Sequence, residues 1–284
     1  MGITSKSLGL VALLCAAACH QQPQSAATAT APQKAAAAEP CKLKVGWDPW
    51  EPYQYETADG QIAGLDVELA RELADTAGCS LNFVQGNWAD HLAAIKTGDI
   101  DLLLAATPNS QREPFAIFSE PYRDENMAMF VRSDKLEELG DQSLAELVAK
   151  GKRVAVTDGY FYGPEVAEMM TADDTAGAFV RSRIVEAGYA RLVDGQVDVL
   201  LDDPVVAASV LRRKGWSDAV ARHPGQVHDG QVALMFSRAS VPQDLVQRFE
   251  KALELSRRSG RIESVVARYV DQDMSGKSDK KSLN

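Results

Sequence analysis

The sequence predicts an α/β fold made of two successive series of strands and helices. From residue 42 onward, short apolar runs with strand character alternate with amphipathic helical segments, and the same alternation starts again near Lys152. Such alternation is typical of a mostly parallel sheet with crossover helices. The chain has 284 residues, 45% of them hydrophobic and 25% charged, which suits one large domain or two modest ones.

The first series contains three predicted strands and two predicted helices. The helix over 64–78 presents Leu69, Leu73 and several alanines on one face, with charged residues between them. The strand at 100–105 (IDLLLA) is too apolar to be half-exposed, so we expect it to be buried. The other strands are expected at 43–47 and 80–84, and the other helix at 88–96.

The second series has predicted strands at 153–157 and 197–202, with helices from about Pro164 and from Pro204. Pro204 suits the first turn of a helix, where the missing N–H would have no partner. A strand at 231–237 and two helices, around 242–257 and 260–270, are left over at the end. Residues 272–284 are polar and terminal, so we expect them to be disordered.

The N-terminus has the features of an export signal over residues 1–19. Lys6 supplies a positive charge, and the apolar run over 8–18 is shorter than the ~20 residues that a membrane-spanning helix needs. The run ends in three alanines and Cys19, which resembles the lipobox of bacterial lipoproteins, although Ala16 stands where that motif usually has Leu. We predict lipidation at Cys19, a flexible tether over 20–40, and a location in the periplasm or at the surface of the cell envelope, with plain secretion as the alternative.

Two of the four cysteines, Cys15 and Cys19, belong to the export signal, which leaves Cys41 and Cys79 for the mature body. Both come just before predicted strands. If those strands are parallel neighbours, their starts lie side by side, and an oxidising compartment favours a disulfide between them. Two buried free thiols are the alternative.

Several function classes find no support in the sequence. The net charge is −10, and no Lys- or Arg-rich run is interleaved with aromatic residues, so nucleic acid is not an expected partner. The four histidines are scattered, without the Cys or carboxylate spacing of a metal site. No Gly-rich phosphate loop or nucleophile motif is present, so we expect neither a cofactor nor catalytic residues.

Five segments stand out along the chain, in this order: WDPWEPYQY (47–55), GQIAGLDVELARELA (60–74), NWADHLAAIKTGDIDLLLAATPNSQREPFAIFSEPY (87–122), GQVDVLLDD (195–203) and SGRIESVVARYV (259–270). They resemble segments of the periplasmic amino-acid-type solute-binding proteins of ABC importers, the bacterial extracellular solute-binding proteins of family 3. The resemblance covers about residues 42–270.

The resemblance implies a type II periplasmic-binding-protein fold. Each of two lobes is then a mostly parallel sheet flanked by helices, and two crossover strands form the hinge. Lobe one would comprise 41–130 and 231–271, and lobe two 131–230. A small ligand would bind in the cleft between the lobes of a monomer, which would deliver it to an ABC permease.

The same resemblance places candidate ligand-binding residues. Arg112 falls where the family binds a carboxylate, which a guanidinium holds through two parallel hydrogen bonds. Thr107 would add donors, Ala105 a backbone carbonyl, and Asp203 a carboxylate for an ammonium group. The alternatives are a surface pair of Arg112 with Glu113 and a capping role for Asp203 at the next helix.

Aromatic residues would form one wall of the cleft. Trp50 and Tyr53 align with the aromatic wall of the family, close to Asp48, while core packing is the alternative. Trp88 begins a predicted helix and suits core and cleft equally.

The chain departs from the family after the strand at 153–157. Family members have a Gly followed by two Thr there, whereas this chain has DGYFYG over 158–163. Gly159 can still offer its backbone N–H, but Tyr160 and Phe161 make this side of the cleft bulkier and more apolar. An aromatic, small or modified ligand, or a carboxylate without the full amino-acid head, therefore fits better than a standard amino acid.

We thus expect an extracytoplasmic receptor that closes around an amino-acid-like or carboxylate ligand. Two alternatives remain. Cyclohexadienyl dehydratases, which act on prephenate or arogenate, share the fold, and a ligand-sensing component without a transporter would need the same cleft.

Overall fold

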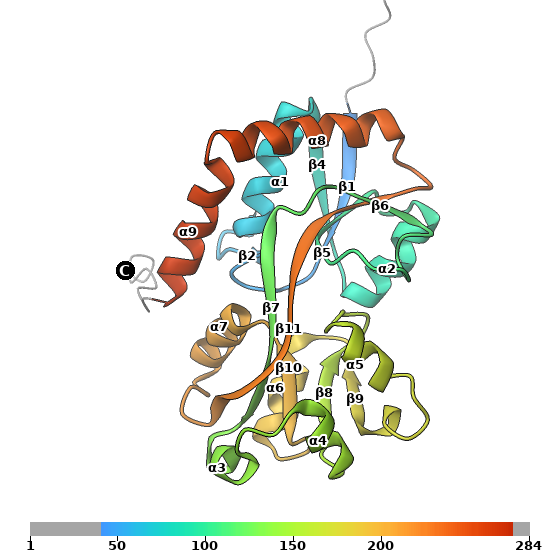
Figure 1. Cartoon of the computed structure of the whole chain (residues 1–284). Coiled ribbons are helices and arrows are strands. Elements are labelled where there is room, and N and C mark those ends of the chain that lie inside the picture. Colours follow the sequence, from blue (N-terminus) through green and yellow to red (C-terminus); the bar gives the residue numbers. More distant parts are fainter. Residues whose placement is uncertain (1–40, 275–284) are drawn as a thin grey trace, which may run out of the picture. The chain divides into compact units, whose positions relative to one another are not determined.

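The computed structural model describes residues 41–274, and they form two α/β lobes that share two long strands (Figure 1). The α/β class with two lobes is confirmed by the strands and helices of these residues. The predicted export signal, Cys19, the tether over 20–40 and the end of the tail after residue 274 lie outside the described residues. Within 41–274, no helix is long and apolar enough to cross a membrane.

Lobe one is built on β1 (Cys41–Trp47), which pairs in parallel with β4 (Cys79–Gln85) and β5 (Leu102–Ala106). β5 is almost wholly buried because its residues are leucine and alanine. The sheet continues antiparallel into β11 (Val220–Ser237), which also pairs with β6 (Ala116–Phe118). A short hairpin joins β2 (Tyr55–Glu56) to β3 (Ile62–Ala63).

Four helices surround this sheet. They are α1 (Leu65–Thr76), α2 (Trp88–Thr97), α8 (Gln243–Arg258) and α9 (Arg261–Met274). The leucine and alanine face of α1 is buried, and this helix packs against β4, β5, α8 and α9. α2 begins where the Asn87 side chain accepts a hydrogen bond from the Asp90 N–H and ends at Gly98 in a left-handed conformation.

Lobe two is built on β10 (Val199–Asp202), which lies between β8 (Val154–Thr157) in parallel and β7 (Arg123–Arg132) antiparallel. β8 pairs in parallel with β9 (Phe179–Ser182). The helices of this lobe are α3 (Leu136–Leu139), α4 (Leu144–Ala149), α5 (Pro164–Met169), α6 (Val185–Val193) and α7 (Pro204–Lys214).

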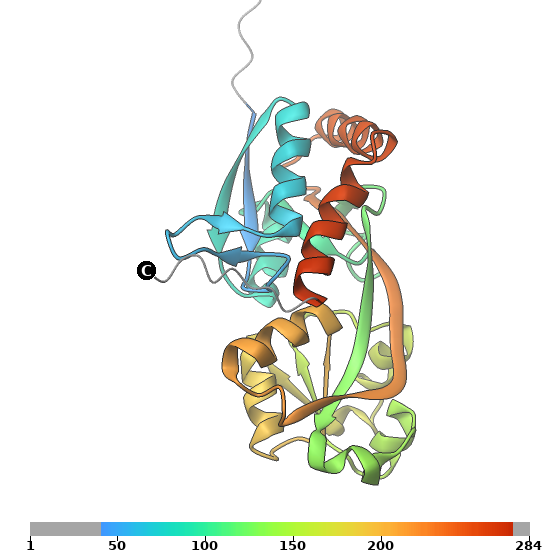
Figure 2. The same ribbon diagram turned by 90° about the vertical axis from the view of Figure 1, so that its left-hand side faces the viewer.

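The two crossover strands are β7 and β11, which pair with each other and run between the lobes side by side (Figure 2). The boundaries predicted at residues 131 and 231 fall inside these two strands. At the lobe-one end of β7, Arg123 forms a buried ion pair with Asp66 of α1, with Nε and Oδ1 2.8 Å apart. The Tyr122 hydroxyl donates to the same Asp66 oxygen at 2.8 Å, so the start of the hinge is fixed to α1.

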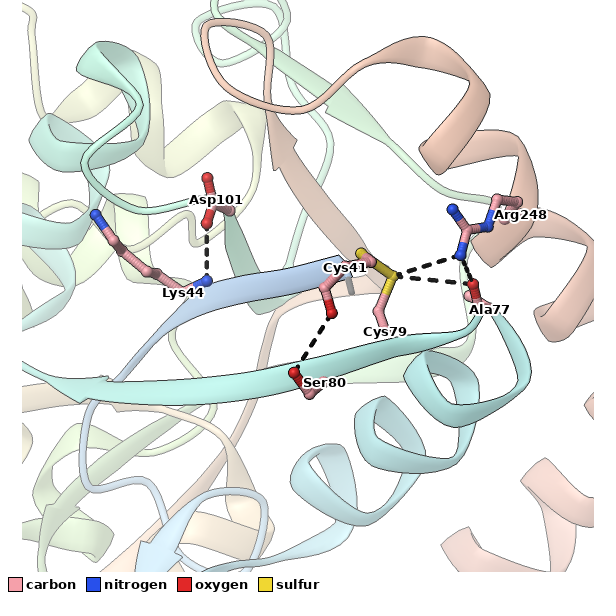
Figure 3. The surroundings of a disulfide bond; sticks show 7 residues. All are labelled: Cys41, Lys44, Ala77, Cys79, Ser80, Asp101 and Arg248. Atoms are coloured by element: carbon pink, nitrogen blue, oxygen red, sulfur yellow. Dashed lines mark hydrogen bonds between the residues drawn. A yellow bond between two sulfur atoms is a disulfide. The ribbon is translucent and has the colours of Figure 1, made fainter. Parts of the chain in front are cut away.

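The predicted disulfide joins Cys41 to Cys79, which face each other in the parallel register of β1 and β4 (Figure 3). Arg248 of α8 donates to the carbonyl of Ala77, two residues before β4. Next to the bond, the Ser80 hydroxyl donates to the Cys41 carbonyl at 3.4 Å. The disulfide is therefore confirmed, and it fastens the starts of the two strands to the packing of α8.

Candidate functional site

A small cavity lies between the ends of β1, β5 and β8 and the strand β7. The centre of a water-sized sphere can occupy about 30 Å³ of this cavity. The cavity therefore has room for one or two water molecules. Eight of the eleven predicted ligand-binding residues line it. The full lining is Asp48, Trp50, Gln54, Trp88, Leu104, Ala105, Thr107, Arg112, Glu125, Met127, Tyr160 and Phe161.

Arg112 lies buried in the turn that follows β5. Its own N–H donates to the carbonyl of Asn109 at 3.0 Å, which fixes the start of the side chain. The guanidinium donates from Nη1 to the Thr107 carbonyl and from Nη2 to the Gly159 carbonyl, both at 2.9 Å. Burial lowers the Arg112 pKa to about 10, so the group is cationic at neutral pH. Arg112 therefore faces the other lobe instead of forming a surface pair with Glu113.

Two buried carboxyl groups share the cavity with this cation. The Thr107 hydroxyl donates to Glu125 Oε2 at 2.8 Å. Burial raises the pKa of Glu125 to about 7 and that of Asp48 to about 6. The Tyr160 hydroxyl donates to Asp48 Oδ2 at 3.2 Å. The cavity thus holds one permanent cation and two carboxyl groups that gain and lose protons near neutral pH.

The aromatic wall consists of two buried tryptophans that both pack against Tyr160. Trp50 comes from the loop after β1, and Trp88 is the first residue of α2. Each tryptophan ring lies edge-on to Tyr160, with centroids 6.1 Å apart in both pairs. This is a preferred geometry for aromatic pairs.

Ala105 and Gly159 both have positive φ values beside the cavity. Ala105 has φ 52°, a conformation that costs energy for a residue with a Cβ. Gly159 has φ 78°, and a Cβ there would lie 3.0 Å from Leu92 Cδ1 and 3.1 Å from Trp88 Cδ1. Gly159 was predicted to offer its N–H, but the contact that the structure shows is its carbonyl, which accepts from Arg112 and from Trp88 Nε1 at 3.0 Å.

Asp203 and Tyr53 do not line this cavity. They line a neighbouring hollow of about 540 Å³. Asp203 caps α7, because its Oδ1 accepts from the N–H groups of Val205 at 2.7 Å and Val206 at 3.2 Å. The Tyr53 hydroxyl donates to the same carboxylate at 3.3 Å. The capping alternative is thus what the structure displays, and a ligand contact of Asp203 stays a prediction.

The sequence reasoning missed four lining residues, which are Gln54, Leu104, Glu125 and Met127. A signal for Glu125 was available. It lies in a strand in phase with Met127 and Met129, so its side chain shares their buried face. A lone carboxylate on such a face needs a partner or a raised pKa.

Comparison with known proteins agrees with this architecture. A family model described as bacterial extracellular solute-binding proteins, family 3, matches residues 43–272. The chain belongs to this family. The arginine-binding extracellular protein ArtP of Bacillus subtilis is 25% identical over 221 residues, covering 78% of this chain and 82% of that protein.

Two further proteins are similar. The cyclohexadienyl dehydratase of Pseudomonas aeruginosa is 26% identical over 192 residues, covering 63% of this chain and 65% of that protein. Among solved structures, the amino acid ABC transporter substrate-binding protein AbpA from Streptococcus pneumoniae, bound to L-arginine, has a TM-score of 0.69 at 22% identity, covering 82% of this chain and 95% of that one. The relatives thus include binding proteins and an enzyme.

Proposed function

We propose that this chain is an extracytoplasmic receptor that captures a small amino-acid-like or carboxylate ligand between its lobes and delivers it to an ABC importer. The observation that carries the proposal is Arg112, a buried cation at the junction of the lobes. Family membership and the amino-acid-binding relatives support the same ligand class.

Ligand entry requires the lobes to separate, because the cavity holds only one or two waters. Separation around β7 and β11 breaks the bond from Arg112 Nη2 to the Gly159 carbonyl and frees this nitrogen for a carboxylate, while Nη1 keeps its bond to the Thr107 carbonyl. Trp50 and Trp88 then offer apolar faces on the same lobe. A ligand that contacts both lobes stabilises the closed form by the difference between its contacts in the two forms.

The test is a thermal-shift and calorimetric screen of amino acids, aromatic acids, amines and small dicarboxylates. We expect a carboxylate ligand to raise the melting temperature of wild type. Arg112→Ala should weaken binding by about 1.5–3 kcal/mol, since a hydrogen bond to a charged group is lost. Arg112→Lys keeps the charge without the paired donors, and should bind at intermediate strength. Equal affinity of wild type and Arg112→Ala would remove the carboxylate role.

A dehydratase is the second candidate, favoured by Glu125 and by the similarity to cyclohexadienyl dehydratase. With a pKa raised to about 7 by burial, Glu125 is partly protonated at neutral pH and can give a proton to a departing hydroxyl. The test is to incubate the protein with prephenate and to follow the loss of prephenate absorbance, which distinguishes an enzyme from a receptor. Turnover by wild type and none by Glu125→Gln would establish the enzyme.

We also propose that a lipid on Cys19 anchors the receptor to a membrane. Cell fractionation and mass spectrometry of the mature N-terminus test it. We expect the wild-type protein in the membrane fraction with an acylated Cys19, and Cys19→Ala in the soluble envelope fraction. A non-acylated N-terminus in wild type would leave plain secretion.

A further inference from the structure

The segment Gly159–Tyr160 of lobe two contacts the same groups of lobe one that would hold a ligand. The Gly159 carbonyl accepts from Arg112 Nη2 at 2.9 Å and from Trp88 Nε1 at 3.0 Å. The Tyr160 ring packs against both Trp50 and Trp88, with both centroid distances 6.1 Å. Its hydroxyl donates to Asp48 at 3.2 Å. All four partners belong to lobe one.

These contacts describe the chemistry that lobe one accepts. Arg112 and the Trp88 N–H hold an oxygen acceptor, which a carboxylate supplies more strongly than a peptide carbonyl. The tryptophans hold an aromatic ring, and Asp48 accepts from a hydroxyl on that ring. In the segment itself, the nitrogen, Cα and Cβ of Tyr160 join the carbonyl carbon to the ring.

We infer that the Gly159–Tyr160 segment is an intramolecular stand-in for the ligand, and that lobe one recognises a carboxylic acid carrying a hydroxyphenyl group. The inference rests on the proposed receptor function and names the ligand class of the same site. A bound acid of this class takes the position of the Tyr160 ring, since the remaining cavity of about 30 Å³ is too small for it. Tyr160 and the ligand therefore compete for lobe one.

The ring hydroxyl is the feature that selects among aromatic acids. Asp48 is buried, and burial raises its pKa to about 6, so an ionised Asp48 without a donor is disfavoured. A phenol supplies that donor, as Tyr160 does. An aromatic acid without the hydroxyl leaves the buried carboxyl unpaired, and sites of this kind reject such analogues.

The experiment uses calorimetry with 4-(4-hydroxyphenyl)butanoate, whose three carbons between carboxyl and ring correspond to the three backbone and side-chain atoms of Tyr160. Its partner compound is 4-phenylbutanoate. Tyr160→Ala removes the competing ring, so this variant should bind the hydroxyl compound at least tenfold more tightly than wild type does. The variant should also bind the hydroxyl compound at least tenfold more tightly than it binds the phenyl compound. Adding Asp48→Ala, which removes the acceptor of the ring hydroxyl, should reduce the preference for the hydroxyl compound to less than threefold.

Two further variants complete the design. Tyr55→Ala on β2, away from the cavity, should bind as wild type does. Tyr160→Phe keeps the ring and loses only the bond to Asp48, so it should still fold and bind the hydroxyl compound at least threefold more tightly than wild type. Unchanged affinity in both Tyr160 variants, or equal binding of the two compounds by Tyr160→Ala, overturns the inference. If wild type then still binds an amino acid in an Arg112-dependent way, the receptor function stands without it.

Discussion

Glu125→Gln should make the free energy of unfolding less dependent on pH than that of wild type. Burial is the main cause of the raised Glu125 pKa, opposed by the charge of Arg123 and by the hydrogen bond from Thr107. Between the ordinary pKa of 4.5 and the folded value of about 7, the folded protein keeps a proton that the unfolded chain has released. This contribution to stability is complete below about pH 4.5 and is lost as the pH rises through 7.

The magnitude follows from the difference between those two pKa values. One pKa unit corresponds to about 1.4 kcal/mol, so ionised Glu125 costs the folded state about 3 kcal/mol at high pH. Most of this cost, about 2–3 kcal/mol, develops between pH 5 and pH 8. A glutamine cannot ionise, and its amide oxygen can still accept from the Thr107 hydroxyl.

The assay is urea unfolding of wild type and variant at several pH values from 5 to 8. The unfolding free energy of Glu125→Gln should rise relative to wild type by about 2–3 kcal/mol over this range. Burial also raises the pKa of Asp48 to about 6 and that of Asp202 to about 7, and both contribute to the pH dependence of wild type and variant alike, so they drop out of the difference. Glu113→Gln, at an exposed position of the same lobe, is the matched control variant. A difference that changes by less than about 1 kcal/mol would refute the assignment of Glu125 as a buried carboxyl.

Other expectations concern the helix cap and the disulfide. Asp203→Ala should lower the unfolding free energy by about 1 kcal/mol, whereas Asp203→Asn keeps a capping oxygen and should unfold like wild type. If Asp203→Asn nevertheless binds ligand more weakly in calorimetry, the carboxylate contacts an ammonium group in the complex. Replacing Cys41 and Cys79 with Ser opens a cross-link of sequence separation 38 and should cost about 4 kcal/mol in urea unfolding. An unchanged unfolding midpoint in the serine variant would contradict this.

Much of the arrangement could be predicted because it depends on local pattern and parallel pairing. Cys41 and Cys79 each open a strand, so parallel neighbours bring them together. Ala105 lies at the end of one buried strand, and Thr107 and Arg112 follow it. Strand ends in such sheets meet at one edge. The Tyr160 substitution was visible as a departure from the family pattern.

The remainder depends on tertiary pairing, which leaves no clear mark in the sequence. The first part of β11 (Val220–Ser237) has the polar sequence HPGQVHDG over 223–230 and is a strand because it pairs with β7. From the sequence, Asp203 could either cap a helix or contact a ligand. The structure shows that its side chain accepts hydrogen bonds from backbone N–H groups at the start of α7. Likewise, the sequence could not show that Gly159 uses its carbonyl, because that contact requires the position of Arg112 on the other lobe.

The disulfide also determines which strands receive a pulling force that is applied to the chain before Cys41. Cys41 is the first described residue, and its cross-link joins β1 to β4, which pair in parallel along their whole length. A pull on the chain before Cys41 is shared by both strands from their first residues, so they cannot be peeled apart from that end. In the order of the sheet, β5 lies between this pair and the crossover strands β11 and β7. A load that enters through the chain before Cys41 therefore reaches β1 and β4 before it reaches the crossover strands.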